Sequence, residues 1–206
     1  MTEFEKELEK LRVVAEPKFI DPMEPKYFDT KEENHKTYTN ALTWPVLEHP
    51  YKGADLVFKG NKYLVLDHEL KQVVYLMRWT TREVLSRQAA YQVIVWSDPA
   101  VNEIRGYAPK VFFGHLFAKN KLICTDRLQT PGGKRFWISA ITSAIKAGLN
   151  VYYLDMNRQP RVYAHIGSMT KFEEYDNQGL IWSKENKGKG QLLLISEEQI
   201  PQFHKA

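Results

Sequence analysis

The order of elements is set by one stretch in the middle of the chain, residues 121–155, which reads KLICTDRLQTPGGKRFWISAITSAIKAGLNVYYLD. Its first part, Leu122–Leu128, combines apolar and β-favouring residues over strand length and predicts a strand. The pair Thr130-Pro131 then offers a capping hydroxyl and a proline at a first helical position. The apolar residues that recur at helical spacing behind this pair are Trp137, Ile141, Ala144, Ile145 and Gly148. Gly148 predicts the end of this helix, and Val151–Leu154 predicts a second strand.

The turn at Gln129–Lys134, which reads QTPGGK, indicates an anion site. A helix start leaves its first N–H groups unpaired, and glycines let a ligand approach the backbone closely. The spacing fits neither a Walker loop nor the three-glycine dinucleotide fingerprint. It resembles the pyrophosphate loop of the GCN5-related N-acetyltransferase (GNAT) superfamily, whose pattern is Gln or Arg, two residues, Gly, one residue, then Gly or Ala. Gln129 and Gly132 match the first two fixed positions, and Lys134 departs from the third.

Further parts of the family outline follow in order. After its fifth strand a GNAT protein has an Asn, a short helix carrying a Tyr, and a Leu-Gly-Phe-like end. Here Asn157, Tyr163 and Ile166-Gly167 stand in that order, with Pro160 where the family favours Ala. The resemblance covers about residues 110–196.

This resemblance implies an α/β (α+β) fold with a mixed, mostly antiparallel central sheet flanked by helices. We expect an N-terminal helical and irregular extension, residues 1–50, packed on a single GNAT-like domain, residues 51–206.

The resemblance also implies that acetyl-CoA, or another acyl-CoA, binds across a splay between the fourth and fifth strands. Its pantetheine would pair with the fourth strand and its pyrophosphate would lie on the glycine turn. The residues expected to bind it are Arg127, Leu128, Gln129, Thr130, Gly132, Gly133, Lys134, Arg135 and Asn157. Tyr163 is the nearest match to the acid that protonates the leaving thiolate.

No motif supplies the base that takes the proton of the attacking amine. Asp126 and Asp155 end the two strands that would flank the thioester, and a partly buried carboxylate there suits general-base work. In the alternative interpretation, each carboxylate caps a loop or pairs with a neighbouring cation, Arg127 or Arg158.

The rest of the chain predicts a mixture of short elements. Residues 2–12 predict an amphipathic helix, and residues 15–50, rich in proline and aromatics, predict a strap without long regular elements. Within this strap, His35 and Tyr38 are expected at ordinary surface positions. The strands expected elsewhere are Asp55–Phe58, Tyr63–Asp67, Gln72–Trp79, Gln92–Trp96, Lys171–Tyr175, Leu180–Trp182 and Gln191–Ile195. The remaining expectations are a helical turn at Arg82–Gln88, a buried helix at Pro109–Lys119 that holds His115 in its interior, and a basic hairpin tip at residues 184–190.

Composition bounds the class of protein. The chain has 206 residues, 43% hydrophobic and 13% aromatic content, and a net charge of +4, which is typical of a folded protein with a modest attraction for phosphates. The single cysteine, Cys124, lies in an apolar strand and predicts a buried, inert thiol. No metal site is expected, because the histidines are scattered without metal spacing. Without a signal peptide or membrane-length apolar run, a soluble cytoplasmic protein is expected.

Three functional interpretations follow. The first is an acyl-CoA-dependent N-acyltransferase in which an amine acceptor attacks the thioester directly. The second is a non-catalytic protein on the same fold that binds a protein or nucleic-acid partner. Lys134, Pro160 and the N-terminal strap favour this second interpretation, since each departs from a standard cofactor cleft. The third is a nucleic-acid-binding module that uses the basic loop and aromatic side chains, with salt-dependent affinity.

Overall fold

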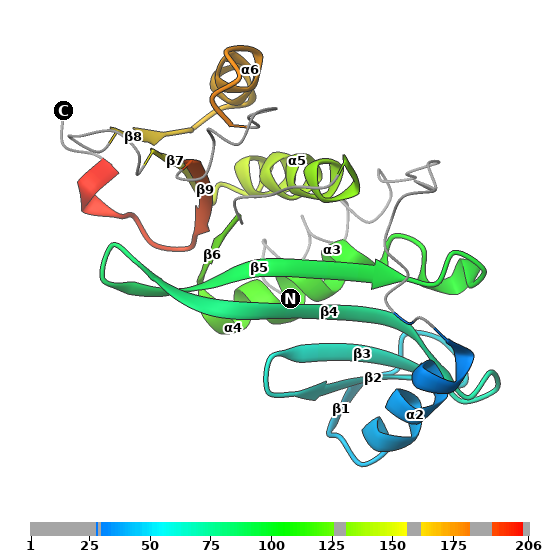
Figure 1. Ribbon diagram of the computed structural model, residues 1–206. Helices are drawn as coiled ribbons and strands as arrows, with labels where there is room; N and C mark the ends of the chain where they lie inside the picture. The colour runs from blue at the N-terminus through cyan, green and yellow to red at the C-terminus, as the bar shows by residue number, and fades with distance from the viewer. Residues whose placement is uncertain (1–27, 29, 126–130, 156–161, 182–190, 204–206) are drawn as a thin grey trace.

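The protein is a mixed α/β structure built on one large, mostly antiparallel sheet with helices on its faces, which confirms the expected fold class (Figure 1). The computed structural model describes residues 28, 30–125, 131–155, 162–181 and 191–203. Within these residues the sheet has nine strands in the order β1-β2-β3-β4-β5-β6-β9-β7-β8. None of the helices in these ranges is long and apolar enough to cross a membrane.

The strands are β1 Val46–Glu48, β2 Ala54–Lys59, β3 Lys62–Asp67, β4 Gln72–Val84, β5 Arg87–Ser97, β6 Leu122–Cys124, β7 Asn150–Asp155, β8 Val162–His165 and β9 Gln191–Ser196. The α-helices are α2 Lys31–Ala41, α3 Tyr107–Val111, α4 Ala118–Asn120, α5 Pro131–Lys146 and α6 Met169–Asn177. The shorter or irregular turns of helix are η1 Asn102–Ile104, η2 Phe112–Phe117 and η4 Pro201–Phe203.

The first five strands form an antiparallel meander, as the sequence predicted for β2, β3 and the cores of β4 and β5. The predicted helical turn at Arg82–Gln88 is wrong. These residues continue β4 to Val84 and begin β5 at Arg87, so the two strands make a long hairpin. Leu85 and Ser86 form its tip with φ of 51° and 61°, the left-handed conformation that two-residue hairpin turns require.

The middle of the chain forms the predicted strand–helix–strand unit, β6-α5-β7. Trp137, Ile141 and Ala144 are buried along one side of α5, and Gly148 ends the helix with φ of 72°. β6 and β7 are nevertheless not neighbours. The later strand β9 lies between them and pairs antiparallel with both.

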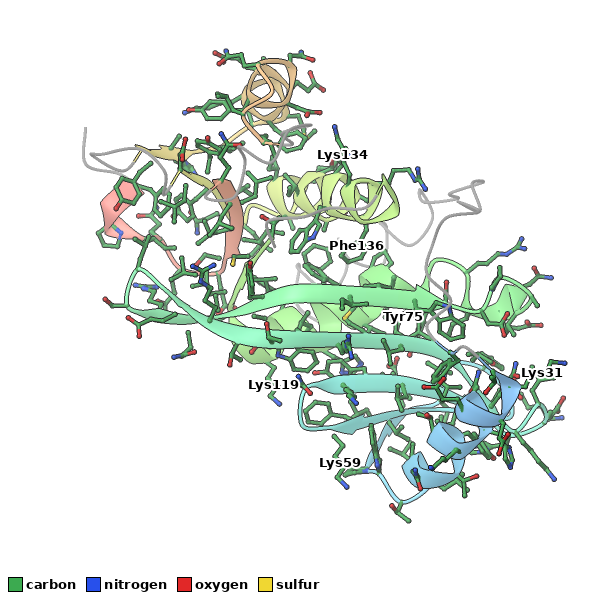
Figure 2. The ribbon with its side chains drawn as sticks, viewed as in Figure 1. Lys31, Lys59, Tyr75, Lys119, Lys134 and Phe136 are labelled. Carbon is green, nitrogen blue, oxygen red and sulfur yellow. The ribbon has the colours of Figure 1, made fainter. Side chains whose placement is uncertain are left out.

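The two faces of the sheet are covered differently. Helices α3, α5 and α6 contribute to one core with the inward residues of β2–β7 and β9, including Trp137, Phe112 and Phe172. On the other face, α2 packs over β2–β4 through Tyr38 and Ala41. The turn η4 covers the strands from β6 to β9 on that second face through Phe203. Figure 2 shows Phe136 pointing from α5 towards α3, where its ring centroid lies 5.2 Å from that of Phe112.

The predicted helix at Pro109–Lys119 is confirmed as part of a continuous helical run from Tyr107 to Asn120. Its middle part, Phe112–Phe117, has π-helical hydrogen bonding, a geometry that no pattern in the sequence predicted. His115 in this part is partly buried against the ring of Tyr63, with centroids 5.7 Å apart, as expected for an interior or boundary histidine.

Two predictions outside the central unit are wrong for local reasons. Residues 31–41 form the regular helix α2, because Thr30 caps it by accepting a hydrogen bond from the Glu33 backbone N–H at 3.0 Å. Tyr38 on this helix is therefore buried, while His35 is exposed as expected. Lys171–Tyr175, predicted as a strand, lies in helix α6, which begins where Ser168 accepts from the Lys171 N–H at 3.2 Å.

Three further predictions concern the C-terminal part and the ends of the chain. Leu180 and Ile181, expected in a strand with Trp182, are in a bend. Tyr163, expected on a short helix, lies in strand β8. The helix predicted at residues 2–12, the loop at residues 184–190 and the end of the strand predicted up to Leu128 lie outside the described residues.

Candidate functional site at the carboxyl edge of the parallel strands

The two adjacent parallel strands of the described sheet are β5 and β6. In the part of the chain that the structure describes, they pair at Ala90 and Ile123, although β5 continues to Ser97. The other side of β5 is paired with β4 up to Ser97, and within the described residues no strand pairing with β6 is found beyond Ala90. The GNAT resemblance predicted a splay between the strands that end near Asp126 and Asp155, but these strands, β6 and β7, are separated by β9.

Helices begin at the same edge of the sheet after both strands, because parallel strands end on the same side. The chain leaves β5 through the turn η1 and Gly106, which has φ of 73°, and enters the helical run that starts at Tyr107. It leaves β6 and enters α5 at Pro131. The starts of two helices therefore belong to this edge, a position where α/β proteins bind ligands.

The predicted cofactor turn lies only partly within the described residues. Arg127, Leu128, Gln129, Thr130 and Asn157 lie outside them, as does Asp126. Among the others, Gly132 and Gly133 are half-buried in the first turn of α5 and Arg135 is exposed. Lys134 extends from α5 towards α6, where its Nζ lies 3.4 Å from the Asp176 carboxylate (Figure 2).

A second match to the family loop pattern became visible only with the strand order. Glu103, Gly106 and Ala108 have the spacing of the three fixed positions, and the last two residues match in type. These residues follow β5, the first strand of the parallel pair, whereas Gln129–Lys134 follows the second. The signal was present in the sequence, but choosing between the two turns needed the pairing of β5 with β6.

Asp155 is the predicted base candidate that the structure describes. It ends β7 and is 4% exposed, on the face covered by α5 and α6. The Tyr153 hydroxyl donates to its Oδ2 at 3.5 Å. On the neighbouring strand, directly opposite, is Gln191, the first residue of β9. Thr125, just after β6, is also buried at this edge and exchanges hydrogen bonds with the Leu193 backbone.

Tyr163 does not share this location. It lies opposite Leu154 on β8, so its side chain is on the other face of the sheet, where its ring packs against Phe203 with centroids 5.2 Å apart. The structure therefore places the two described catalytic candidates, Asp155 and Tyr163, on opposite faces of the sheet.

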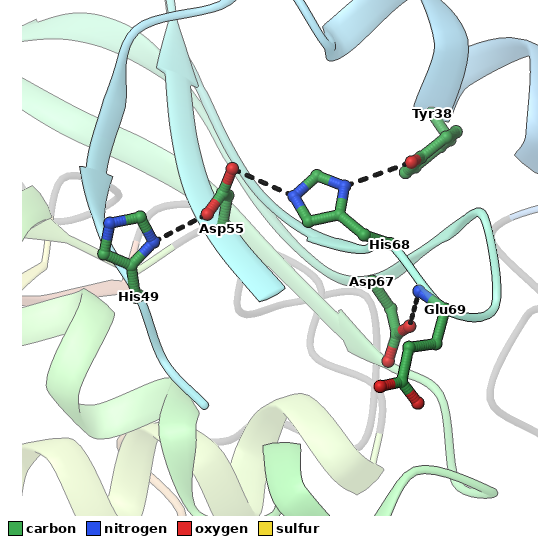
Figure 3. A network of polar contacts seen from close by, with 6 residues as sticks. All are labelled: Tyr38, His49, Asp55, Asp67, His68 and Glu69. Carbon is green, nitrogen blue, oxygen red and sulfur yellow. Dashed lines mark hydrogen bonds and ion pairs between the residues drawn. The ribbon is translucent and has the colours of Figure 1, made fainter. Parts of the chain in front are cut away.

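A separate polar cluster lies where β2 and β3 meet α2 (Figure 3). Asp55 accepts from His49 at 2.7 Å and from His68 at 2.9 Å, and the other ring nitrogen of His68 lies 3.1 Å from the Tyr38 hydroxyl. Burial alone would raise the pKa of Asp55, but the hydrogen bonds from His68 and His49 outweigh it and lower that pKa. The side chains of the cluster form hydrogen bonds with one another, so we interpret the cluster as a structural link between α2 and the sheet.

Glu48 forms a second tie, between strand β1 and the start of the α3 helix. Its carboxylate accepts from the Tyr107 hydroxyl and lies 2.9 Å from Lys110 Nζ and 3.7 Å from His115 Nε2. Burial would raise the pKa of Glu48, but the hydrogen bonds from Tyr107 and Lys110 hold it below its usual value. These contacts fix the helix that starts at Tyr107 and therefore the turn before it.

No group of metal-ligating side chains occurs within the described ranges. No family model matches the sequence, and no curated protein matches it either. One solved structure to which the chain is similar is described as a GCN5-related glucosamine N-acetyltransferase region in a fungal multi-domain GH3 β-N-acetylglucosaminidase. The likeness has a TM-score of 0.32 at 10% identity and covers 69% of this chain. The chain spans 20% of that protein, so the function is argued below from its own strand order and side chains.

Proposed function

We propose that this protein is an acyl-CoA-dependent N-acyltransferase whose co-substrate lies in the opening between β5 and β6. The observation that carries the proposal is the short parallel pairing of β5 with β6, which is found at Ala90 and Ile123 within the described residues although β5 continues to Ser97. Pantetheine is an extended chain with amide groups, and it suits an unpaired strand edge as a further strand does. In the family that the sequence resembles, this is how acyl-CoA binds.

The pyrophosphate of the co-substrate is placed at the turn before Tyr107. Gly106 has the positive φ and the lack of a side chain that a close backbone approach to phosphate needs. Glu103 departs from the Gln or Arg of the pattern and adds a negative charge there. The first turn of α5, with Gly132, Gly133, Lys134 and Arg135, is the second candidate for the same anion, and its two cations suit a phosphate.

The chemistry that this placement supports is direct transfer. The nitrogen of an amine acceptor attacks the thioester carbonyl carbon, the C–S bond breaks, and the CoA thiolate leaves. A carboxylate at the carboxyl edge takes the proton that the nitrogen loses, and Asp155 is the described residue proposed for this role.

A second candidate function is supported by a specific observation. In the family outline, the helix after the fifth strand carries the tyrosine that protonates the thiolate. If β5 corresponds to the fourth strand of the family, then β6 corresponds to the fifth and the helix after it is α5. Residues 131–146 contain no tyrosine, and Tyr163 lies on the far face. A protein that binds acyl-CoA or a partner on this fold without catalysing transfer is therefore the alternative.

Thermal unfolding with and without acetyl-CoA tests the proposal. A ligand at about 100 times its Kd stabilises the fold by about 2.7 kcal/mol, which corresponds to a shift in Tm of a few degrees. Gly106→Val and Gly148→Val are matched variants, since both glycines have nearly the same positive φ, 73° and 72°. Gly106 comes directly before helix α3, whereas Gly148 comes after the end of helix α5. Each substitution costs about 1–2 kcal/mol of strain.

We expect acetyl-CoA to stabilise the wild type and Gly148→Val, but not Gly106→Val. Loss of the shift in Gly132→Trp instead would move the pyrophosphate to the first turn of α5. No shift in the wild type at millimolar acetyl-CoA contradicts the proposal. A shift without release of free CoA in the presence of amine acceptors supports the non-catalytic alternative.

A further inference from the structure

The side-chain oxygen of Gln191 is in an environment that is unusual for a folded protein. Its side-chain Oε1 is buried and has no hydrogen-bond partner among the described residues, whereas the residue as a whole is only half-buried. Buried polar atoms are nearly always paired, and an exception calls for an explanation such as a ligand that is absent. The position is at the carboxyl edge of the sheet, where β9 begins.

The neighbours of this oxygen define the chemistry of the missing partner. Asp155 lies directly opposite Gln191 on β7, and residues opposite each other on antiparallel strands project their side chains from the same face. The Asp155 carboxylate, 4% exposed, therefore brings a negative charge beside an amide oxygen. Both groups accept hydrogen bonds, and a carboxylate has room for several donors.

Two aromatic rings lie on the same side of the sheet as Asp155. Tyr153 lies two residues before Asp155 on the same face, and the Tyr175 ring of α6 packs against it with centroids 5.1 Å apart. Tyrosine faces attract cations, and a carboxylate, an amide oxygen and aromatic rings together suit an ammonium group.

We propose that Gln191 is a positioning residue that, with Asp155, binds the primary ammonium group of the acceptor. The inference rests on the proposed amine transfer and names its substrate class, a primary amine that is cationic in water. A neutral alcohol of the same shape lacks both the charge and the number of N–H donors. The site selects the acceptor, and the opening between β5 and β6 holds the co-substrate.

The test uses putrescine and 1,4-butanediol, which have the same carbon chain and differ in their charged ends. Each is titrated into isotopically labelled wild-type protein without CoA, and the backbone amide NMR signals of Asp155 and Gln191 are followed. We expect putrescine to shift these signals at concentrations where 1,4-butanediol does not. In Gln191→Leu the Kd for putrescine is expected to rise about tenfold or more, the size of one lost hydrogen bond to a charged group.

Two further variants keep this inference testable. Gln178→Leu removes an exposed glutamine at the end of α6 and is expected to bind putrescine as the wild type does. Gln191→Glu keeps an oxygen at the site and adds negative charge, so its affinity is expected to be equal or higher, and it replaces Gln191→Leu if that variant does not fold.

Putrescine binding that is unchanged in Gln191→Leu, lost in Gln191→Glu, or directed to other residues would overturn the inference. Because these titrations contain no CoA, their outcome is separate from that of the acetyl-CoA melting experiment. An amine site in a protein that ignores acetyl-CoA would contradict the transferase proposal and leave Gln191 as an amine-binding residue.

Discussion

Ala90 on β5 pairs in parallel with Ile123 on β6, and this contact joins the antiparallel meander β1–β5 to the second group of strands, β6, β9, β7 and β8. Within the described residues this is the register pair of the two strands, although β5 continues to Ser97. The opening that we assign to acyl-CoA therefore depends on how firmly this junction is held.

Ile123 is fully buried at the junction, and its replacement by alanine is expected to be costly. Ile123→Ala leaves a cavity between β5, β9 and the helices above them, and such changes lower the free energy of unfolding by about 2–5 kcal/mol. Ile94→Ala is the matched control, because Ile94 on β5 is 39% exposed and its loss is expected to cost under about 0.5 kcal/mol. Urea denaturation of both variants measures the difference, and equal costs would contradict the packing described for β6.

Asn34 fastens α2 to the sheet through two hydrogen bonds to one residue. Its Nδ2 donates to the Val73 carbonyl at 3.0 Å, and its Oδ1 accepts from the Val73 N–H at 2.7 Å. Asn34→Ala leaves both backbone groups without these partners in a buried position, which is expected to cost about 1–3 kcal/mol. Asn40→Ala, at an exposed position of the same helix, is expected to change stability little. Similar denaturation midpoints for the two variants would contradict this role of Asn34.

Tyr63 is expected to make stability fall at alkaline pH. Burial raises its pKa to about 12, above the usual tyrosine value of about 10. Below a pH of about 10 the Tyr63 hydroxyl is protonated in both the folded and the unfolded state, so its titration does not lower the free energy of unfolding. Between about 10 and 12 the unfolded chain loses the proton while the folded protein keeps it, so the free energy of unfolding drops by about 1.4 kcal/mol per pH unit.

The variant Tyr63→Phe removes this titration and keeps the ring that packs against Trp79, 5.2 Å away between centroids. The difference in unfolding free energy between wild type and variant is therefore expected to shrink or reverse as the pH rises from about 9 to about 11.5. Parallel stability curves over this range would show that the Tyr63 hydroxyl titrates normally.

Features fixed by neighbours in the sequence were predictable. The helix from Pro131, its buried side at Trp137 and Ile141, and its end at Gly148 follow from capping, helical spacing and the positive φ that glycine allows. The N-cap hydrogen bond from the Glu33 N–H to Thr30 was equally local, but the surrounding prolines drew the prediction of residues 15–50 towards irregular structure.

Features fixed by distant pairing were not predictable in the same way. The hairpin tip at Leu85 and Ser86 lacks the Asn-Gly or glycine signal of its turn type, so tertiary pairing of β4 with β5 overrides the local pattern. The insertion of β9 between β6 and β7 brings together strands far apart in the chain, and no local pattern specifies it. Because of that insertion, the strands that end near Asp126 and Asp155 are not adjacent, and the adjacent parallel pair in the described sheet is β5 and β6.

The sequence therefore indicated which residue types could form the candidate site, but not which of these residues lie next to one another. Asp155 was a candidate from its position at a strand end, and the structure adds its neighbour Gln191, which no spacing in the sequence links to it. The turn at Gly106 matches the family pattern at two positions but gains meaning only as the exit of β5.

Hydrogen–deuterium exchange with and without acetyl-CoA tests the central claim most directly. If acyl-CoA pairs with the edge of β5 that faces β6, amides in residues 91–97 and in the turn around Gly106 become protected when it binds. Peptides from β2, residues 54–59, lie in the paired meander and serve as the control that stays unchanged. Protection confined to other segments, or no change at saturating acetyl-CoA, would contradict the placement of the co-substrate between β5 and β6.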